Sequence, residues 1–197
     1  LMKKTKRAKK SRTWVIKQHR DQFFKKAKVL GYRSRAAFKL IELNKKFNFI
    51  KKNSNLLDIG STPGGWSQVA SKIITNGKIL SVDLQPMEKI ENVLFLNNNF
   101  SDKKTQDEIL KIFNDKIDII ISDMAENTTG NKTIDSIRTN GLCSDVINFS
   151  LKILNNKGSL VCKIFMGEDF LEVKNLAKKN FKKVEFFKPE SSRSESK

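Results

Sequence analysis

The apolar positions of this chain fall into short runs that alternate with segments of helical spacing. Leu56, Leu57 and Ile59 form one such run, which stops at Gly60, and a segment with apolar side chains three and four residues apart, 66–77, follows it. A short apolar run indicates a buried parallel strand, and spacing of three and four indicates an amphipathic helix. The pattern therefore predicts a strand, a turn and a helix in succession.

The same alternation continues to the end of the chain. Further strands are predicted at 77–84, 93–100, 117–124, 159–165 and 182–189, and further helices at 34–47, 104–113, 134–154 and 170–179. Repeated strand–helix units with apolar strands indicate a parallel sheet. The predicted fold class is therefore α/β, with a mostly parallel sheet and helices on both faces.

The helix predicted at 34–47 has a recognisable start and a recognisable buried side. Ser34 is the candidate N-cap, because a serine hydroxyl can accept a hydrogen bond from the first turn of a helix. Its apolar side chains are Phe38, Leu40, Ile41 and Phe47. We expect these four to face the core.

Composition places the chain among single-domain folded proteins. Its 197 residues are 38% hydrophobic and include 14 Phe, which is enough to build a core. No apolar run reaches the roughly 18 residues that span a bilayer, so we expect no membrane and a cytoplasmic location. Cys143 and Cys162 are too few and too isolated for a disulfide framework or a zinc site, and His19 is the single histidine. We expect two buried thiols, no metal and a monomer.

The positive charge is concentrated at the beginning of the chain. Residues 1–52 hold 19 Lys and Arg against two acidic residues, whereas the remaining 145 residues hold 20 against 19. Such a concentration favours a polyanion as partner, and nucleic acid is the leading candidate. A solvated tail is the alternative interpretation. We predict a basic RNA-binding segment, 1–30, ahead of a domain at 31–197.

Candidate chemistry collects where the predicted strands end, which is where ligands bind in open α/β sheets. Gly60 and Gly64 belong to a turn, GSTPGG, that lets a ligand approach the main chain. Asp83 follows Gly60 by 23 residues, the separation at which an acidic residue meets ribose hydroxyls; a turn-capping role is the alternative. Because the turn is not GxGxxG, a pyrophosphate cofactor fits poorly, and S-adenosylmethionine fits better.

Two lysines stand in apolar surroundings. Lys163 lies within the strand SLVCKIF, where burial is costly unless the amine has a partner or a task. A buried amine with a lowered pKa can act as a base, and Asp123, at the end of another strand, could orient it. Lys39 lies within the apolar part of its helix. The alternatives are an edge-strand charge for Lys163 and a surface lysine with a buried stem for Lys39.

Six blocks carry a resemblance to a known family. They are RSRAAFKL, LLDIGSTPGGWSQ, VDLQPM, SDMAENTTG, GSLVCKIFMGE and KPESSRSES, in the family's order and spacing. In them the chain resembles the FtsJ/RrmJ-type ribose 2′-O-methyltransferases, and most of all the bacterial enzymes that act on large-subunit ribosomal RNA. The resemblance implies a Rossmann-like methyltransferase sheet of seven strands, with S-adenosylmethionine as the methyl donor.

The resemblance also assigns residues to roles. It implies a catalytic set in which Lys163 is the base, Lys39 a neighbouring cation and Asp123 their orienting anion. The implied donor-site residues are Gly60, Gly64, Trp66, Asp83, Asn99 and Asp123. From the concentration of positive charge, the residues expected to bind RNA are Arg12, Lys17, Arg20, Arg33 and Arg35. Asn99 stands where the family has an acidic residue, and Glu126 stands where it has a proline.

The resemblance runs past the end of the given sequence. The family's fourth catalytic residue, a Glu five positions after Arg193, would fall one position beyond Lys197, and Glu195 is three positions short of it. The seventh strand is absent as well, so we expect a methyltransferase domain that is incomplete at its C-terminal end.

The resemblance implies an RNA ribose 2′-O-methyltransferase whose substrate is a uridine in the A-loop of large-subunit RNA. Two alternatives stay open: a non-catalytic ribosome-assembly factor with the same fold, and a tRNA 2′-O-methyltransferase. A small-molecule methyltransferase would have no use for the basic segment.

Overall fold

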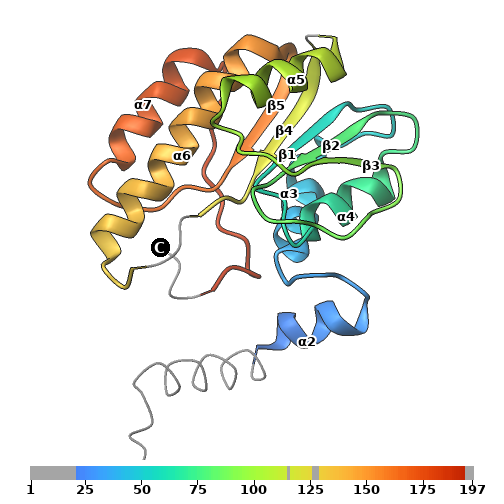
Figure 1. The fold of residues 1–197 in the computed structure, drawn as a ribbon. Helices are drawn as coiled ribbons and strands as arrows, with labels where there is room; N and C mark the ends of the chain where they lie inside the picture. Colours follow the sequence, from blue (N-terminus) through green and yellow to red (C-terminus); the bar gives the residue numbers. More distant parts are fainter. Residues whose placement is uncertain (1–20, 115, 126–128, 194–197) are drawn as a thin grey trace, which may run out of the picture.

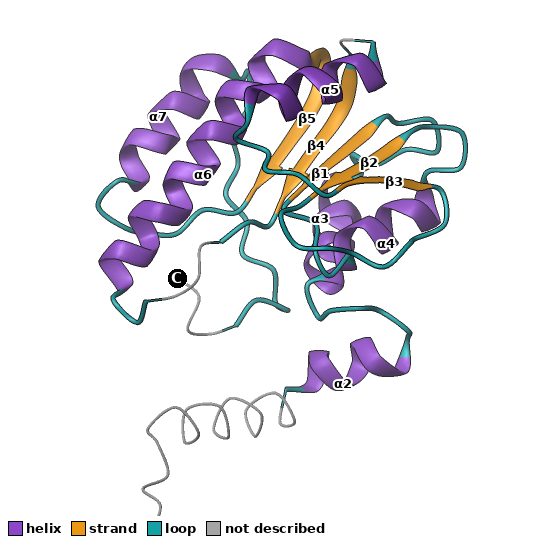
Figure 2. Ribbon diagram, in the orientation of Figure 1, coloured by secondary structure: helices purple, strands orange, loops and turns teal. Residues whose placement is uncertain are grey.

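The computed structural model describes residues 21–114, 116–125 and 129–193 (Figure 1). Five strands form one parallel sheet in the order β3-β2-β1-β4-β5, with helices on both faces (Figure 2). The strands are β1 (Leu56–Ile59), β2 (Ile79–Val82), β3 (Val93–Leu96), β4 (Ile117–Ser122) and β5 (Leu154–Cys162). The described helices are α2 (Gln22–Val29), α3 (Ala37–Phe47), α4 (Gly65–Ile73), α5 (Lys103–Phe113), α6 (Lys132–Ile153) and α7 (Phe170–Asn180). The predicted α/β class is confirmed.

The central strands are buried on both faces, and successive side chains enter opposite cores. Leu56 of β1 packs with Leu40 of α3 and Val69 of α4, whereas Leu57 packs with Phe149 of α6. Full burial of one such side chain stabilises the fold by about 1.5–3 kcal/mol. The near-continuous apolar runs in the sequence therefore reflect two cores that share one sheet.

The topology places a ligand site between β1 and β4. The chain leaves β1 toward β2 and returns through β3 and α5 to β4, on the other side of β1. Loops that follow β1 and β4 therefore diverge at the carboxyl edge of the sheet, and this switch point is where open α/β sheets bind ligands. None of the helices in the described ranges is long and apolar enough to cross a bilayer.

The prediction of a sixth strand at 182–189 is wrong. This segment has no regular secondary structure and joins no ladder with a described strand. Its anchors are side chains instead, because Phe187 packs edge-on against Phe47 of α3 with ring centroids 5.9 Å apart, and Pro189 is buried. Alternating apolar residues predict a strand only where a neighbouring strand is available to pair.

The predicted cap of α3 is also wrong. The helix begins at Ala37, its N-cap is Ala36, and no side chain caps it. Ser34 lies in the preceding turn with its hydroxyl against Gly65, where an added Cβ would lie 2.3 Å from Ser34 Oγ. The expected buried side is present, since Phe38 and Leu40 are buried and Ile41 and Phe47 pack partly buried against the core.

Helix α3 and the residues just before it contact both ends of the described chain. The carboxylate of Glu42 accepts hydrogen bonds from the backbone N–H groups of Glu190 and Ser191, at 2.6 and 3.1 Å. Arg35 pairs with Asp21, the N-cap of α2, and donates to the Ser191 carbonyl. The basic N-terminal helix and the C-terminal segment are therefore tied to α3 and to the loop directly before it.

The two cysteines are free and lie side by side between α6 and β5. Cys143 is buried, Cys162 is partly buried, and both belong to one apolar cluster with α7. A hydrogen bond from one thiol to the other, together with burial, raises the pKa of Cys162. The expectation of thiols packed in the core is met by Cys143 and in part by Cys162.

One carboxyl group lies inside the fold. Asp58 in β1 is 1% exposed, and Ser67 Oγ of α4 donates to its Oδ2 at 2.6 Å, with Ser81 Oγ of β2 a further 2.8 Å away. Burial, reinforced by the charges of Asp123 and Asp83, raises the pKa of Asp58 from 3.8 to about 7, against the opposing hydrogen bond from Ser67.

We expect this carboxyl to make the folded chain less stable as the pH rises from about 4 to about 7. Over that interval the folded chain keeps the Asp58 proton and the unfolded chain has released it, so the free energy of unfolding falls as the pH increases. Asp58→Asn removes the titration. The difference in unfolding free energy between variant and parent, measured by urea denaturation, should grow by a few kcal/mol over the interval; a flat difference would contradict the expectation.

Two glycines should respond to alanine with opposite signs. A Cβ on Gly77 would lie 1.9 Å from the Ser54 carbonyl oxygen, so Gly77→Ala must displace backbone and should cost about 1–3 kcal/mol of stability. Gly141 lies inside α6 with open space around it, so Gly141→Ala should add about 0.5–1 kcal/mol. Urea denaturation of both variants measures the two effects, and equal signs would refute the packing argument.

Candidate active site

Three charged side chains from separate parts of the sequence meet at the carboxyl edge of the sheet. The amine of Lys39 lies 2.7 and 3.0 Å from the two carboxylate oxygens of Asp123, and the amine of Lys163 lies 3.7 Å from Asp123 Oδ1. Each of the three side chains is about one-fifth exposed, at 19–23%. The structure thus brings together the predicted set of two cations around one anion.

The backbone explains why they meet. Asp123 is the first residue after β4, and Lys163 is the first after β5, where its N–H donates to the Ser122 carbonyl at 2.9 Å. Parallel neighbouring strands end at the same edge, so the two side chains emerge together. Lys39 reaches them from the first turn of α3.

The environment makes Lys163 a better proton acceptor than an ordinary lysine. Burial lowers the pKa of Lys163, and the neighbouring cations Lys39 and Arg193 lower it further, whereas Asp123 raises it; the net shift is downward. The amine also lies 5.3 Å from the ring centroid of Phe165. A partly desolvated amine beside a fixed carboxylate is suited to removing a proton from a substrate hydroxyl.

The glycine turn, residues 60–65, faces this cluster and opens α4. Gly60 and Gly64 have φ of 74° and 104°, and a Cβ on Gly60 would lie 2.0 Å from Met124 Cγ. The first N–H groups of α4 have no partners within the helix, and they give that end a partial positive charge. The turn can therefore bind an anionic group of a ligand through its backbone.

Asp83 links the glycine turn to the end of β2. Its Oδ2 accepts from Thr62 N–H at 2.9 Å, and its Oδ1 accepts from Gln85 N–H at 2.7 Å. Asn97, beyond β3, donates its amide to the carbonyls of Asp83 and Leu84. The capping role considered for Asp83 is present in the structure, and each carboxylate oxygen retains a lone pair for a ribose hydroxyl.

A loop before α3 covers one side of the glycine turn. This docking loop, residues 31–36, is bound to α4 because Trp66 Nε1 donates to the Ala36 carbonyl at 2.8 Å and Gln68 Oε1 accepts from Arg33 N–H at 2.7 Å. The guanidinium group of Arg33 donates to the carbonyls of Pro63, Glu88 and Lys89. The loop that leads to Lys39 is therefore fixed to the turn that leads to α4.

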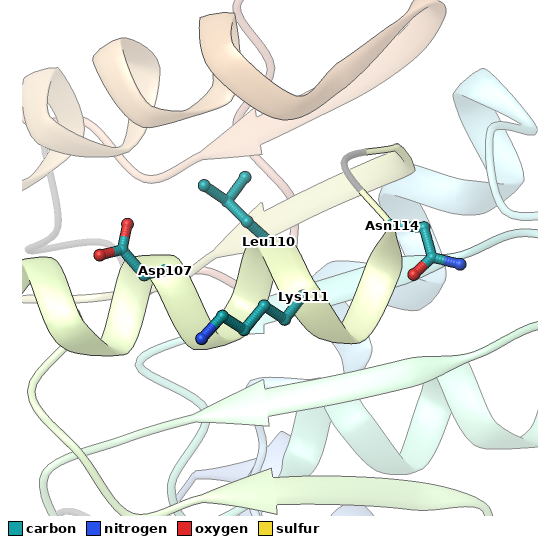
Figure 3. Close-up of a pocket in the computed structure, with 4 residues that line it drawn as sticks. All are labelled: Asp107, Leu110, Lys111 and Asn114. Atoms are coloured by element: carbon teal, nitrogen blue, oxygen red, sulfur yellow. The ribbon is translucent and has the colours of Figure 1, made fainter.

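A narrow crevice separates the docking loop from the glycine turn. Asp58, Trp66 and Asp123 also line it. A more open hollow lies on α5, lined by Asp107, Leu110, Lys111 and Asn114 (Figure 3), whose side chains spread along the helix and do not converge on one point. The crevice, and not the hollow on α5, adjoins the charged cluster.

The other residues predicted to bind the donor or RNA do not all lie at the site. Asn99 follows β3, is partly buried and accepts a hydrogen bond from Ser101 N–H through its side-chain oxygen, so its proposed contact with a ligand stays a prediction. Arg33 and Arg35 use their guanidinium groups inside the protein, which gives them a structural role whether or not they contact RNA. Arg12, Lys17 and Arg20 lie outside the described residues, as do Glu126 and Glu195.

Sequence reasoning missed several polar side chains of the site. Asp58 was overlooked within an apolar run, although a carboxyl in such a run is the same signal that singled out Lys163. Gln68 and Asn97 gave no signal, because their partners lie in distant loops. In the ranges that the structure describes, no group of three or more His, Cys, Asp or Glu side chains could hold a metal ion.

Comparison with known proteins agrees with this geometry. Residues 32–197 match the FtsJ-like methyltransferase family. The chain is 45% identical to the ribosomal RNA large subunit methyltransferase E of Pelagibacter ubique, covering 95% of this chain and 92% of the relative. It is also 45% identical to the protein of that name from Rickettsia akari, covering 97% and 87%.

A solved structure with a similar fold is a ribosomal RNA methyltransferase from Plasmodium falciparum. It superposes with a TM-score of 0.74 at 36% identity, over 81% of this chain and 93% of the other. Sequence and structure thus agree on one family. This chain belongs to the FtsJ-like methyltransferases.

Proposed function

We propose that this protein transfers a methyl group from S-adenosylmethionine to a ribose 2′-hydroxyl of large-subunit ribosomal RNA. The observation that carries the proposal is the cluster of Lys39, Asp123 and Lys163 beside the glycine turn. The names of the relatives from Pelagibacter ubique and Rickettsia akari support ribosomal RNA as the substrate. A uridine of the A-loop, in an assembled or nearly assembled cytoplasmic subunit, is the target we favour.

The described residues fit the donor. The hydroxyl of Ser61, in the glycine turn, is buried and has no hydrogen-bond partner among the described residues, so it is available to a ligand. The N-terminus of α4 suits the donor carboxylate, and Asp83 suits the ribose hydroxyls. When bound, S-adenosylmethionine supplies an electrophilic methyl group on a sulfonium centre.

The charged cluster supplies the remaining chemistry. A ribose 2′-hydroxyl is a weak nucleophile until its proton has a destination, and Lys163, with its lowered pKa, accepts that proton. Lys39 orients the hydroxyl, and Asp123 orients both amines. Alignment of the hydroxyl with the methyl group contributes several kcal/mol, and general-base catalysis contributes a further ~10²–10⁴-fold.

The basic N-terminal part of the chain binds the RNA backbone. Lys25, Lys26 and Lys28 of α2 are exposed and so available to phosphates. Arg35, in the docking loop directly before α3, pairs with Asp21 at the N-cap of α2, and α3 carries Lys39. Phosphate contacts at α2 therefore hold the RNA against the face from which Lys39 emerges, and their strength falls with salt.

Loss of the base should slow transfer and leave donor binding intact. Large subunits that lack the modification are incubated with labelled donor, and a 2′-O-methyl ribose is detected after nuclease digestion. Lys163→Ala should lower kcat by ~10²–10⁴-fold, whereas replacement of Lys157, an exposed lysine of β5, by Ala should leave kcat unchanged.

Two results would contradict the proposal. A parent-like rate for Lys163→Ala would remove Lys163 as the base. Donor binding by the parent protein without any transfer to RNA would favour the assembly-factor alternative.

The pH dependence should shift in opposite directions in two variants. Since the base acts in its neutral form, the rate rises with pH and levels off above the pKa of Lys163. Lys39→Met removes a cation that lowers this pKa, so the rising limb should move to higher pH. Asp123→Asn removes the anion that raises it, so the limb should move to lower pH, at a reduced maximal rate. Profiles of kcat that shift the same way would refute the assignment.

A further inference from the structure

Lys163 lies where the hydrogen bonds between β4 and β5 end. Its own N–H bond to the Ser122 carbonyl, 2.9 Å long, extends the ladder between β4 and β5 by one step. Residues 164–169 then leave the sheet and run to the start of α7. The position of the Lys163 amine therefore depends on what holds this connecting segment.

The segment is held by a buried side chain of α6. The amide of Asn140, 0% exposed, donates to the Phe165 carbonyl at 3.0 Å and to Asp169 Oδ1 at 2.9 Å. Its oxygen accepts from Phe165 N–H at 2.9 Å. A side-chain amide has two donor hydrogens and an acceptor oxygen, so Asn140 binds both polar groups of residue 165, as a neighbouring strand would.

Two further contacts hold residues 164–169 close to α6. A Cβ on Gly167 would lie 1.9 Å from Ser136 Oγ, so only glycine permits this approach. Asp169 is the N-cap of α7, yet its carboxylate caps no N–H group of that helix and accepts instead from Asn140 and, at 3.5 Å, from Ser136. The contact with α6 has taken the place of a local helix cap.

Phe165 connects this anchor to the amine. It lies two residues after Lys163, and in extended chain such residues face the same side. Its ring centroid is 5.3 Å from the Lys163 amine, so the ring shields the amine from water and attracts its charged form. Fixing the backbone of Phe165 thus fixes one wall around the amine.

We propose that Asn140 is a positioning residue for methyl transfer, which holds Phe165 and thereby keeps the Lys163 amine desolvated beside Asp123. The proposal rests on the proposed function, because it assumes that Lys163 acts as the base. It assigns a catalytic consequence to a buried amide that lies outside the charged cluster and the crevice.

The test replaces the amide by a carboxylate of the same shape. Asn140→Asp keeps the acceptor for Phe165 N–H but loses both donors, and it places a carboxylate against that of Asp169. Asn148→Asp makes the same change at an exposed position of the same helix and is the matched control. Both proteins are assayed as full chains with large subunits and donor.

We expect Asn140→Asp to lower kcat by about tenfold or more, with KM for donor and RNA within about twofold of the parent. The rising limb of the pH profile should move to higher pH, because burial is the largest cause of the lowered pKa of Lys163, and its loss outweighs the loss of the ring contact. Hydrogen exchange, followed by mass spectrometry over 163–169, should become faster. The control should match the parent in all three measurements.

A second variant covers the case in which the two facing carboxylates prevent folding. Asn140→Asp combined with Asp169→Asn removes the repulsion and still leaves the Phe165 carbonyl without its donor. It should fold and show the same slower transfer and faster exchange.

Two outcomes would overturn the proposal. One is unchanged exchange over 163–169. The other is faster exchange with a parent-like kcat and pH profile. Failure of the proposed function would look different: Lys163→Ala would retain the parent rate, whatever the exchange at Phe165.

Discussion

The site depends on one shared anion. Asp123 lies between two amines, and Lys39 occupies both of its oxygens at shorter distances than Lys163 reaches. Unit charges about 4 Å apart interact by about 4 kcal/mol at the effective dielectric typical of a protein surface. Both lysines are therefore attracted to this carboxylate. Asp123 orients Lys163 but also favours its charged form. Burial and the charge of Lys39 oppose that tendency, and the net effect is a lowered pKa of Lys163.

The sheet sets the positions of four functional residues, because each of them directly follows the last residue of a strand. β4 and β5 end directly before Asp123 and Lys163, and β1 and β2 end directly before Gly60 and Asp83. The parallel arrangement places these four strand ends at one edge of the sheet, and it does so without needing any contact between the functional side chains. Apolar burial on two faces therefore fixes where the chemistry lies, whereas it does not fix how each side chain is aimed.

This division explains what could be predicted from the sequence. Periodicity and strand-end residues are local signals, and they located the strand–turn–helix unit together with Asp83, Asp123 and Lys163. The segment 182–189 has the pattern of a strand but no described strand to pair with. The sequence of one segment does not show whether a partner strand will lie beside it. Ser34 has the chemistry of a helix cap but lies against Gly65 instead. Asn140 and Phe165 are 25 residues apart, and no spacing rule relates a buried amide to the loop that it binds.

The missed residues share a physical task. Gln68 holds the docking loop before Lys39, Asn97 holds the end of β2 behind Asp83, and Asn140 holds the segment after Lys163. Each is an amide that binds backbone groups of a loop, and an amide does this without adding charge to a site whose pKa values depend on the balance of its charges. A lysine or carboxylate in these places would add a charge to that balance. Neutral side chains can therefore fix the loops without adding to the burial and the charges of Asp123, Lys39 and Arg193 that set the pKa of Lys163.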